Sequence, residues 1–336
     1  MKRTIVSLLF LASMALLIAS CKKEAKPQPD HSIIMTSNSA SLSAGTSKQL
    51  ASKNYSASQL TWASSDTTVA TVDATGLVTT LKPGTIVITI KSQTYSVSTT
   101  CNVTVTQAKL TDIGVGADGS VFVIGSDTAN TTGGHSIYKL VNGELHKLQG
   151  CTGIRIAVSP QGAPWVVNES NLIFKYNAGA WTQLPGTGSD IGIGADGSVF
   201  AVGTQLSTVT GGYIIMKWNG SNWDTMPQCA GIRIAVSPAG IPWVINLSNL
   251  VYEYGGYLWT QMPGVAAADI GIGGDGSVFV TGADTGVPAY TPPIYQFNGG
   301  SWSQVPGLSN GTSISVDAHG KVWYIDKSGF LHIPTN

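Results

Sequence analysis

From residue 112 onwards the sequence repeats a pattern of short apolar strands separated by tight turns. The run Asp-Ile-Gly-Val-Gly-Ala-Asp-Gly-Ser-Val-Phe recurs in close copies every 78 or 79 residues, and a related run ending in Pro-Trp lies between the copies. Successive units begin roughly 40 residues apart, which is the length of a four-stranded propeller blade. The six units begin at Asp112, Arg155, Asp190, Arg233, Asp269 and Ser313.

Each unit predicts the same small sheet. An inner apolar strand ends in an Asp-Gly-type turn, a second strand carries Phe or Trp, and a third strand leads through an Asn/Gly turn to a fourth strand. One such sheet cannot cover its own apolar faces, so we expect residues 107–336 to close into a six-bladed β-propeller. The last unit ends at residues 330–333 without the Trp that opens four of the fourth strands. Its blade has three strands or borrows one from residues 104–110; we favour borrowing, because it removes an exposed edge.

Residues 31–106 show a different pattern of short alternating strands separated by Gly and Pro turns. Trp62 lies in one such strand, and turns are predicted at residues 74–76 and 82–84. Strands of about five residues with a central Trp are typical of a small sandwich. We therefore predict an all-β chain, in which an Ig-like β-sandwich precedes the propeller.

The first thirty residues are predicted to direct export. Two basic residues precede a short apolar run, which indicates a signal peptide at residues 1–20. The segment Ile-Ala-Ser-Cys that ends at Cys21 resembles the bacterial lipobox, which implies cleavage before Cys21 and lipid attachment to it; the alternative is an ordinary signal peptide with a chance cysteine. Residues 21–30 form a charged, Pro-containing tether. The lysine after Cys21 resembles a signal for sorting to the outer membrane, so we expect a lipid anchor in the outer membrane or at the cell surface.

Composition excludes several classes of function. Only 11% of residues are charged and the formal net charge is zero, so no basic surface is available for nucleic acid. Beyond Cys21 there are three cysteines, Cys101, Cys151 and Cys229, whose spacing predicts neither a disulfide framework nor a metal site. We expect no cofactor and no metal, and we expect the propeller to be monomeric.

Both domains resemble known families. Residues 31–106 contain W-x-S-S-D, V-A-T-V-D, G-L-V-T and K-P-G-T, and these elements resemble the bacterial Ig-like domain, group 2, which implies an adhesion or spacer module. The propeller contains W-x-x-x-P-G, D-I-x-V-G-x-D-G-S-V-F and I-Y-x-W-N-G, and it resembles the tectonin repeat. That family includes lectins, and the resemblance implies glycan binding at the blade tops or between blades.

Long loops on one face of the ring are the first candidate site. The loops between second and third strands are long in odd blades, at residues 126–136, 204–213 and 283–293, and short in even blades. Long loops on one face often carry binding sites, and these would recur at three places around the ring. His135, Tyr213 and Tyr290 are the side chains most able to stack on a sugar or bond its hydroxyls. The alternative is that the loops only pad the rim.

Charged residues at the start of the inner strands are the second candidate site. Asp112, Arg155, Asp190, Arg233 and Asp269 alternate in sign around the ring, and the sixth position is serine. They form either a structural network of paired charges or a polar channel mouth that holds an ion or an acidic sugar. The serine leaves Asp269 or its neighbour short of a partner.

Catalysis is not expected. Sialidases resemble this architecture but need three arginines and a tyrosine nucleophile, whereas the mature chain has only Arg155 and Arg233. The sequence contains no G-x-S-x-G, no H-E-x-x-H and no calcium loop. We therefore expect a non-catalytic lipoprotein that binds carbohydrate, and the alternative is a protein-interaction or adhesion scaffold with a cell-surface protein as its partner.

Overall fold

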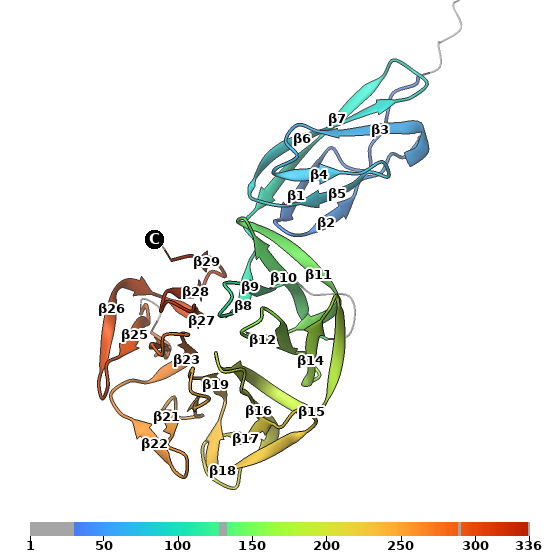
Figure 1. The fold of residues 1–336 in the computed structure, drawn as a ribbon. Helices are drawn as coiled ribbons and strands as arrows, with labels where there is room; N and C mark the ends of the chain where they lie inside the picture. The colour runs from blue at the N-terminus through green and yellow to red at the C-terminus, as the bar shows by residue number, and fades with distance from the viewer. Residues whose placement is uncertain (1–29, 128–132, 288–289, 335–336) are drawn as a thin grey trace, which may run out of the picture.

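The structure, a computed structural model, describes residues 30–127, 133–287 and 290–334 (Figure 1). The predicted signal peptide, Cys21 and all of the tether except Asp30 lie outside the described residues. Regular structure in the described part is β-strand apart from a single 3-10 turn at Ala57–Gln59, and none of its helices could span a membrane. The all-β prediction is therefore confirmed.

The N-terminal domain is a sandwich of two sheets. Its core holds buried isoleucines and valines from the long hairpin of the larger sheet, and Trp62 packs against that core from a partly exposed position. The larger sheet has the order β1 (Ser39–Ser43), β7 (Ser98–Thr106), β6 (Gly84–Ser92) and β3 (Leu60–Ser64), and the smaller has β2 (Ser47–Gln49), β5 (Leu77–Thr80) and β4 (Ala70–Val72).

The rest of the chain forms successive antiparallel sheets arranged around a central axis (Figure 1). We number the sheets formed by the described strands as blades 1 to 6. Blade 1 contains β8 (Leu110–Val115), β9 (Val121–Gly125), β10 (His135–Val141) and β11 (Glu144–Gly153). Blade 2 contains β12 (Arg155–Val158), β13 (Pro164–Val167), β14 (Leu172–Asn177) and the first half of β15 (Ala180–Ile193). Blade 3 contains the second half of β15, β16 (Val199–Leu206), β17 (Tyr213–Trp218) and β18 (Trp223–Gly231).

The remaining blades follow the same order from the axis outwards. Blade 4 contains β19 (Arg233–Val236), β20 (Pro242–Ile245), β21 (Val251–Tyr254) and β22 (Trp259–Met262). Blade 5 contains β23 (Ala267–Ile272), β24 (Val278–Gly282), β25 (Pro293–Phe297) and β26 (Trp302–Ser309). Blade 6 contains β27 (Gly311–Val316), β28 (Val322–Asp326) and β29 (Leu331–His332).

The outer strand of one blade leads directly into the inner strand of the next. In β15 this crossing is continuous, because its first half pairs with β14 and its second half pairs with β16. The inner strands then pack closely around the axis. A Cβ on Gly192 would lie 2.9 Å from the carbonyl oxygen of Ile234 in the next blade, so glycine is required there.

Ring closure differs from the sequence prediction. In the described residues blade 6 has three strands, and the favoured loan of residues 104–110 as a fourth strand is wrong. Thr104 and Val105 belong to β7, which already pairs with β6 on one side and β1 on the other. The ring is instead closed by contacts between blades 6 and 1, in which the Leu110 N–H donates to the Gly329 carbonyl (2.8 Å) and the Val115 N–H donates to the Ser315 hydroxyl (3.0 Å).

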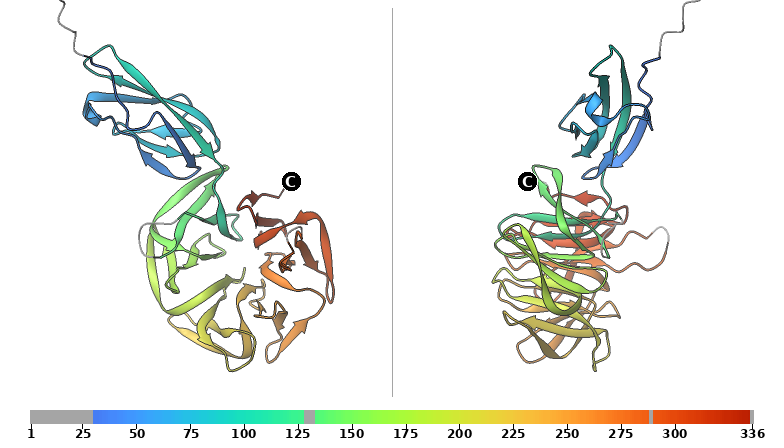
Figure 2. Two further views of the ribbon diagram at one scale, coloured as in Figure 1. Left: turned by 180° about the vertical axis from the view of Figure 1, so that it is seen from behind. Right: turned by 90° about the vertical axis from the view of Figure 1, so that its right-hand side faces the viewer.

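The Ig-like domain packs against blade 1, close to blade 6 and the C-terminus (Figure 2). One apolar cluster runs from the sandwich core through Val105 and Ala108 to Leu110, Tyr138 and Ile325. The two domains therefore share part of their hydrophobic core.

A turn of the Ig-like domain packs against blade 1 at the position where, at other junctions, a turn of the preceding blade packs. In blades 2, 3 and 5 the Trp that opens the fourth strand lies against a left-handed glycine of the preceding blade. These pairs are Trp181–Gly150, Trp223–Gly186 and Trp302–Gly264. Leu145 occupies the Trp position in blade 1, and the glycine against it is Gly45 of the Ig-like domain, with φ +79°. The Ig-like turn thus replaces the bend that a fourth strand of blade 6 would supply.

Candidate functional site

The predicted charged positions meet at one mouth of the central channel. Each aspartate accepts a hydrogen bond from a backbone N–H of the next blade. The bonds are Ile156 N–H to Asp112 (2.7 Å), Ile234 N–H to Asp190 (2.9 Å) and Ile314 N–H to Asp269 (2.9 Å). Because each of these bonds joins an odd blade to the following even blade, the carboxylates fix the inner strands to one another.

The arginines connect these pairs of blades. Arg155 Nη1 lies 3.4 Å from Asp112 Oδ1, and its Nε lies 3.9 Å from Asp190 Oδ1. Arg233 Nε lies 3.7 Å from Asp269 Oδ1. The buried Ser313 hydroxyl, at the position where a third arginine would stand, donates to Asp112 Oδ1 (2.7 Å) and so joins blade 6 to blade 1. The gap at Ser313 thus gives Asp112 an additional donor, while the ion pair of Asp269 among the described residues is with Arg233.

Three buried carboxylates lie near only two guanidinium groups, and this excess of carboxylates affects the pKa values of the cluster. Burial raises the pKa of Asp269 to about 7, and the attraction of Arg233 and Arg155 only partly opposes this. Burial also raises the pKa of Asp190. Burial disfavours the charged form of Arg155, but the carboxylates of Asp112, Asp190 and Asp269 outweigh this effect and raise its pKa.

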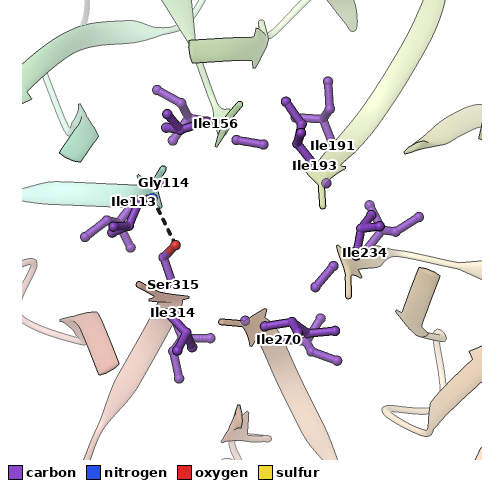
Figure 3. A pocket seen from close by; sticks show the side chains of 18 of the residues that line it. Ile113, Gly114, Ile156, Ile191, Ile193, Ile234, Ile270, Ile314 and Ser315 are labelled. Carbon is purple, nitrogen blue, oxygen red and sulfur yellow. Dashed lines mark hydrogen bonds between the residues drawn. The ribbon is translucent and has the colours of Figure 1, made fainter. Parts of the chain in front are cut away.

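The channel beneath the ring is narrow. It holds a cavity of about 80 Å³, and the buried isoleucines of the inner strands surround its open centre (Figure 3). The Ser315 hydroxyl accepts a hydrogen bond from the Val115 N–H (3.0 Å) across the junction of blades 6 and 1. Pockets that enclose organic ligands usually measure about 300–1,000 Å³, so this space suits water molecules better than a sugar ring.

The three long loops hold their predicted residues in separate places. His135 begins β10, and its Nδ1 lies 2.7 Å from the Asp127 carbonyl oxygen. Tyr213 begins β17 and packs against the apolar cluster between blades 3 and 4. Tyr290 donates its backbone N–H to the Val287 carbonyl (2.9 Å). These residues lie on alternate blades, and the described contacts bring no two of them together.

Each long loop is held against the short turn of the following even blade. The Glu169 N–H donates to the Gly133 carbonyl (3.0 Å), and the Leu247 N–H donates to the Gly211 carbonyl (2.7 Å). In blade 6 the corresponding Lys327 makes an ion pair with Asp284 of the loop (2.7 Å). The three places therefore share a geometry but present an acidic, an apolar and a basic side chain. The structure does not support three equivalent sites.

A larger pocket, which the sequence pattern did not predict, lies where blade 6 meets blade 1. We call it the seam pocket; it measures about 650 Å³. It is lined by Lys109, Leu110, Thr111, Ser126, Thr312, Asp326, Lys327, Ser328, Gly329 and Phe330. The signal was present, because the sequence showed that the last unit lacks a Trp-opening strand. We interpreted that gap as a place for a borrowed strand rather than as an opening.

The comparisons with known proteins agree with this architecture. Residues 31–108 match the model of the bacterial Ig-like domain (group 2), and residues 127–211 match the model of the tectonin domain. No curated protein sequence matches the chain.

Several solved structures are similar at low sequence identity. One is described as YCF48 bound to D1 peptide, with 12% identity, a TM-score of 0.45 and coverage of 83% of this chain and 96% of that one. The WD40 β-propeller domain of Doa1 has 12% identity and a TM-score of 0.45, with coverage of 77% and 89%. Hydrazine synthase of Kuenenia stuttgartiensis has 15% identity and a TM-score of 0.42, with coverage of 64% and 73%.

The family matches and the observed sheets lead to one assignment. The chain contains a bacterial Ig-like domain of group 2 at residues 31–108, and within the ring of sheets that follows, residues 127–211 match the tectonin domain.

Proposed function

We propose that this protein is a non-catalytic, lipid-anchored surface protein whose propeller binds carbohydrate on the face that carries the long loops. The seam pocket is the observation that supports this proposal. Its volume of about 650 Å³ lies within the usual range for small-ligand pockets, and hydroxyl groups, a charged amine and an aromatic ring line it. Sugars are recognised by this combination, because they present hydroxyls at their edges and C–H groups on their faces.

Binding to an array of glycans tests the proposal. The full-length protein, solubilised in detergent, should bind a subset of the immobilised sugars, and soluble forms of those sugars should compete. Substitution of Phe330 by alanine should weaken binding, because the ring is 38% exposed at the pocket and offers an apolar face. If no sugar is retained at high protein density, the carbohydrate proposal is wrong.

A protein-interaction scaffold is the second candidate, and exposed apolar side chains support it. Leu206 and Leu247 are 69% and 60% exposed, and they lie on the long-loop face at blades 3 and 4. Isolated apolar residues are ordinary, but this pair lies beside a loop fixed against a turn. Capture from the native cell surface should then recover a protein that survives glycosidase treatment, and Leu206→Asp with Leu247→Asp should abolish its recovery.

Anchoring is tested separately. Radiolabelled palmitate should be incorporated into the wild-type protein and not into Cys21→Ser, because only the thiol of that cysteine can carry the thioether-linked lipid of this class. Surface exposure is measured by protease digestion of intact cells. Incorporation into Cys21→Ser would contradict the lipid anchor and leave the carbohydrate proposal unaffected.

A further inference from the structure

The seam pocket exists because the junction of blades 6 and 1 differs from the two related junctions. At the junction of blades 6 and 1 the Leu110 N–H donates to the Gly329 carbonyl. The same bond occurs at the junction of blades 2 and 3, from the Gly188 N–H to the Asn171 carbonyl, and at the junction of blades 4 and 5, from the Ala267 N–H to the Asn249 carbonyl. At the latter two junctions the chain that crosses from the outer strand leads straight into the inner strand of the next blade. Among the described residues, no fourth strand crosses from blade 6, so the pocket stays open there.

The side chains at the junction also differ in chemistry. Counted from these matching bonds, the position of Lys109 is held by Thr187 and Ala266 at the other junctions. The position of Phe330 is held by Leu172 and Leu250. A cation and an aromatic ring therefore occur together only at the seam, within the parts of the ring that the structure describes.

One of the charged side chains around the pocket has no ion-pair partner. Lys327 is paired with Asp284 at 2.7 Å. Asp326 accepts the N–H groups of Ser328 (2.8 Å) and Phe330 (3.0 Å), and it lies 2.9 Å from His332 Nε2. Lys109 is exposed and makes no ion pair with any described residue. The Lys109 ammonium is therefore the cation at the pocket that has no ion-pair partner among the described residues.

The hydroxyl groups of the pocket are oriented by their own blades. Thr111 Oγ1 donates to the Gly125 carbonyl (3.1 Å), and Thr312 Oγ1 donates to the Ile325 carbonyl (3.1 Å). A hydroxyl whose proton is used in this way presents its lone pairs to a ligand. These two groups can therefore accept hydrogen bonds from sugar hydroxyls, which are donors.

We infer that the seam pocket binds a sugar that carries a carboxylate, and this inference rests on the proposed carbohydrate function. Lys109 pairs with the carboxylate at the rim, Thr111 and Thr312 accept hydrogen bonds from the ring hydroxyls, and the Phe330 ring packs against the C–H face. Lys109 and Ser126 also line a smaller cavity of about 100 Å³ that continues towards Ala44 and Thr46 of the Ig-like domain. A longer acidic glycan therefore extends from the seam pocket along the interface between the two domains.

Calorimetric titration of the full-length protein in detergent with matched sugars tests the inference. The probes are methyl glucuronide and methyl glucoside, methyl galacturonide and methyl galactoside, and methyl N-acetylneuraminide. At least one acidic sugar should bind about tenfold or more tightly than its neutral counterpart, and added salt should reduce that difference, because an exposed ion pair is screened. Lys109→Gln should remove the preference, while Phe330→Ala should weaken acidic and neutral sugars alike.

The outcomes separate the inference from the proposed function. Lys91→Gln, at an exposed lysine of the Ig-like domain, is the matched control and should bind as the wild type does. Equal binding of acidic and neutral sugars, or an unchanged preference in Lys109→Gln, overturns the inference and leaves carbohydrate binding in place. Binding to neither class overturns both. Thermal unfolding of each variant checks that lost binding does not reflect lost structure.

Discussion

At the scale of single residues, the channel mouth shows which properties a repeat alignment can predict. The alignment placed Asp112, Arg155, Asp190, Arg233 and Asp269 at matching positions, and the structure brings them together around the axis. It could not predict that Ser313 donates to Asp112, because that contact depends on how the first and last blades meet. Pairing within a ring depends on distances of a few tenths of an ångström, which repeat spacing does not contain.

The stability of the protein should depend on the protonation of Asp269. Its pKa is raised to about 7 in the folded protein, against an ordinary value of 3.8 for an aspartate, so the folded state holds a proton that the unfolded state has released. Stability should therefore fall as pH rises from about 4 to about 7, with Asp190 contributing in the same direction. Between pH 5 and pH 8 we expect a loss on the order of 2 kcal/mol from Asp269, measured by urea unfolding.

The variant Asp269→Asn isolates this contribution. It keeps a carbonyl acceptor for the Ile314 N–H and removes the titrating group, so its stability should change less between pH 5 and pH 8 than that of the wild type. Ionisable groups far from the channel mouth are common to both proteins and cancel in the comparison. An identical pH dependence in both proteins would show that Asp269 is ionised throughout this range.

At the scale of elements, the fourth strands show how a repeat can have one geometry and unequal contacts. Trp181 and Trp223 open their strands at the same register position, paired with Tyr176 and Trp218. Trp223 Nε1 donates to the Pro185 carbonyl at 2.9 Å, whereas Trp181 Nε1 is buried and has no hydrogen-bond partner among the described residues. The sequence predicted the strands and their aromatic residues, but it did not show this difference, which depends on the bend of the preceding blade.

Replacement of each tryptophan by phenylalanine should therefore have unequal effects. Trp223→Phe removes a hydrogen bond, and we expect it to lower the free energy of unfolding by about 1–2 kcal/mol, including lost packing. Trp181→Phe removes a similar ring area together with an unsatisfied buried donor, so its cost should be smaller by about 1 kcal/mol. Denaturant unfolding of both variants measures the difference, and equal costs would mean that the Trp223 hydrogen bond contributes nothing net.

At the scale of the whole molecule, the Ig-like domain is part of the propeller's closure. The sequence predicted two domains in this order, and the family matches confirm that assignment. It also favoured a fourth strand of blade 6 formed by residues 104–110, and this prediction is wrong. Both hydrogen-bonding edges of β7 already pair with β1 and β6 inside the sandwich. What the domain supplies is the turn at Gly45, and no local pattern in the sequence indicates a contact between residues about 100 positions apart.

Substitution at Gly45 should uncouple the two domains. A Cβ at Gly45 would lie 2.7 Å from the Tyr138 ring, and φ there is +79°. Gly179→Ala is the matched control, because its φ is +90° and no atom lies within 4 Å of the added Cβ. Both variants bear the backbone strain of about 1 kcal/mol, but only Gly45→Ala also displaces the Tyr138 ring.

Calorimetry should show one unfolding transition for the wild type and Gly179→Ala, and an earlier, separate propeller transition for Gly45→Ala. If Gly45→Ala unfolds like the control, the interface contributes little to closure, and the hydrogen bonds of Leu110 and Val115 to blade 6 must be sufficient to hold blade 1 against blade 6.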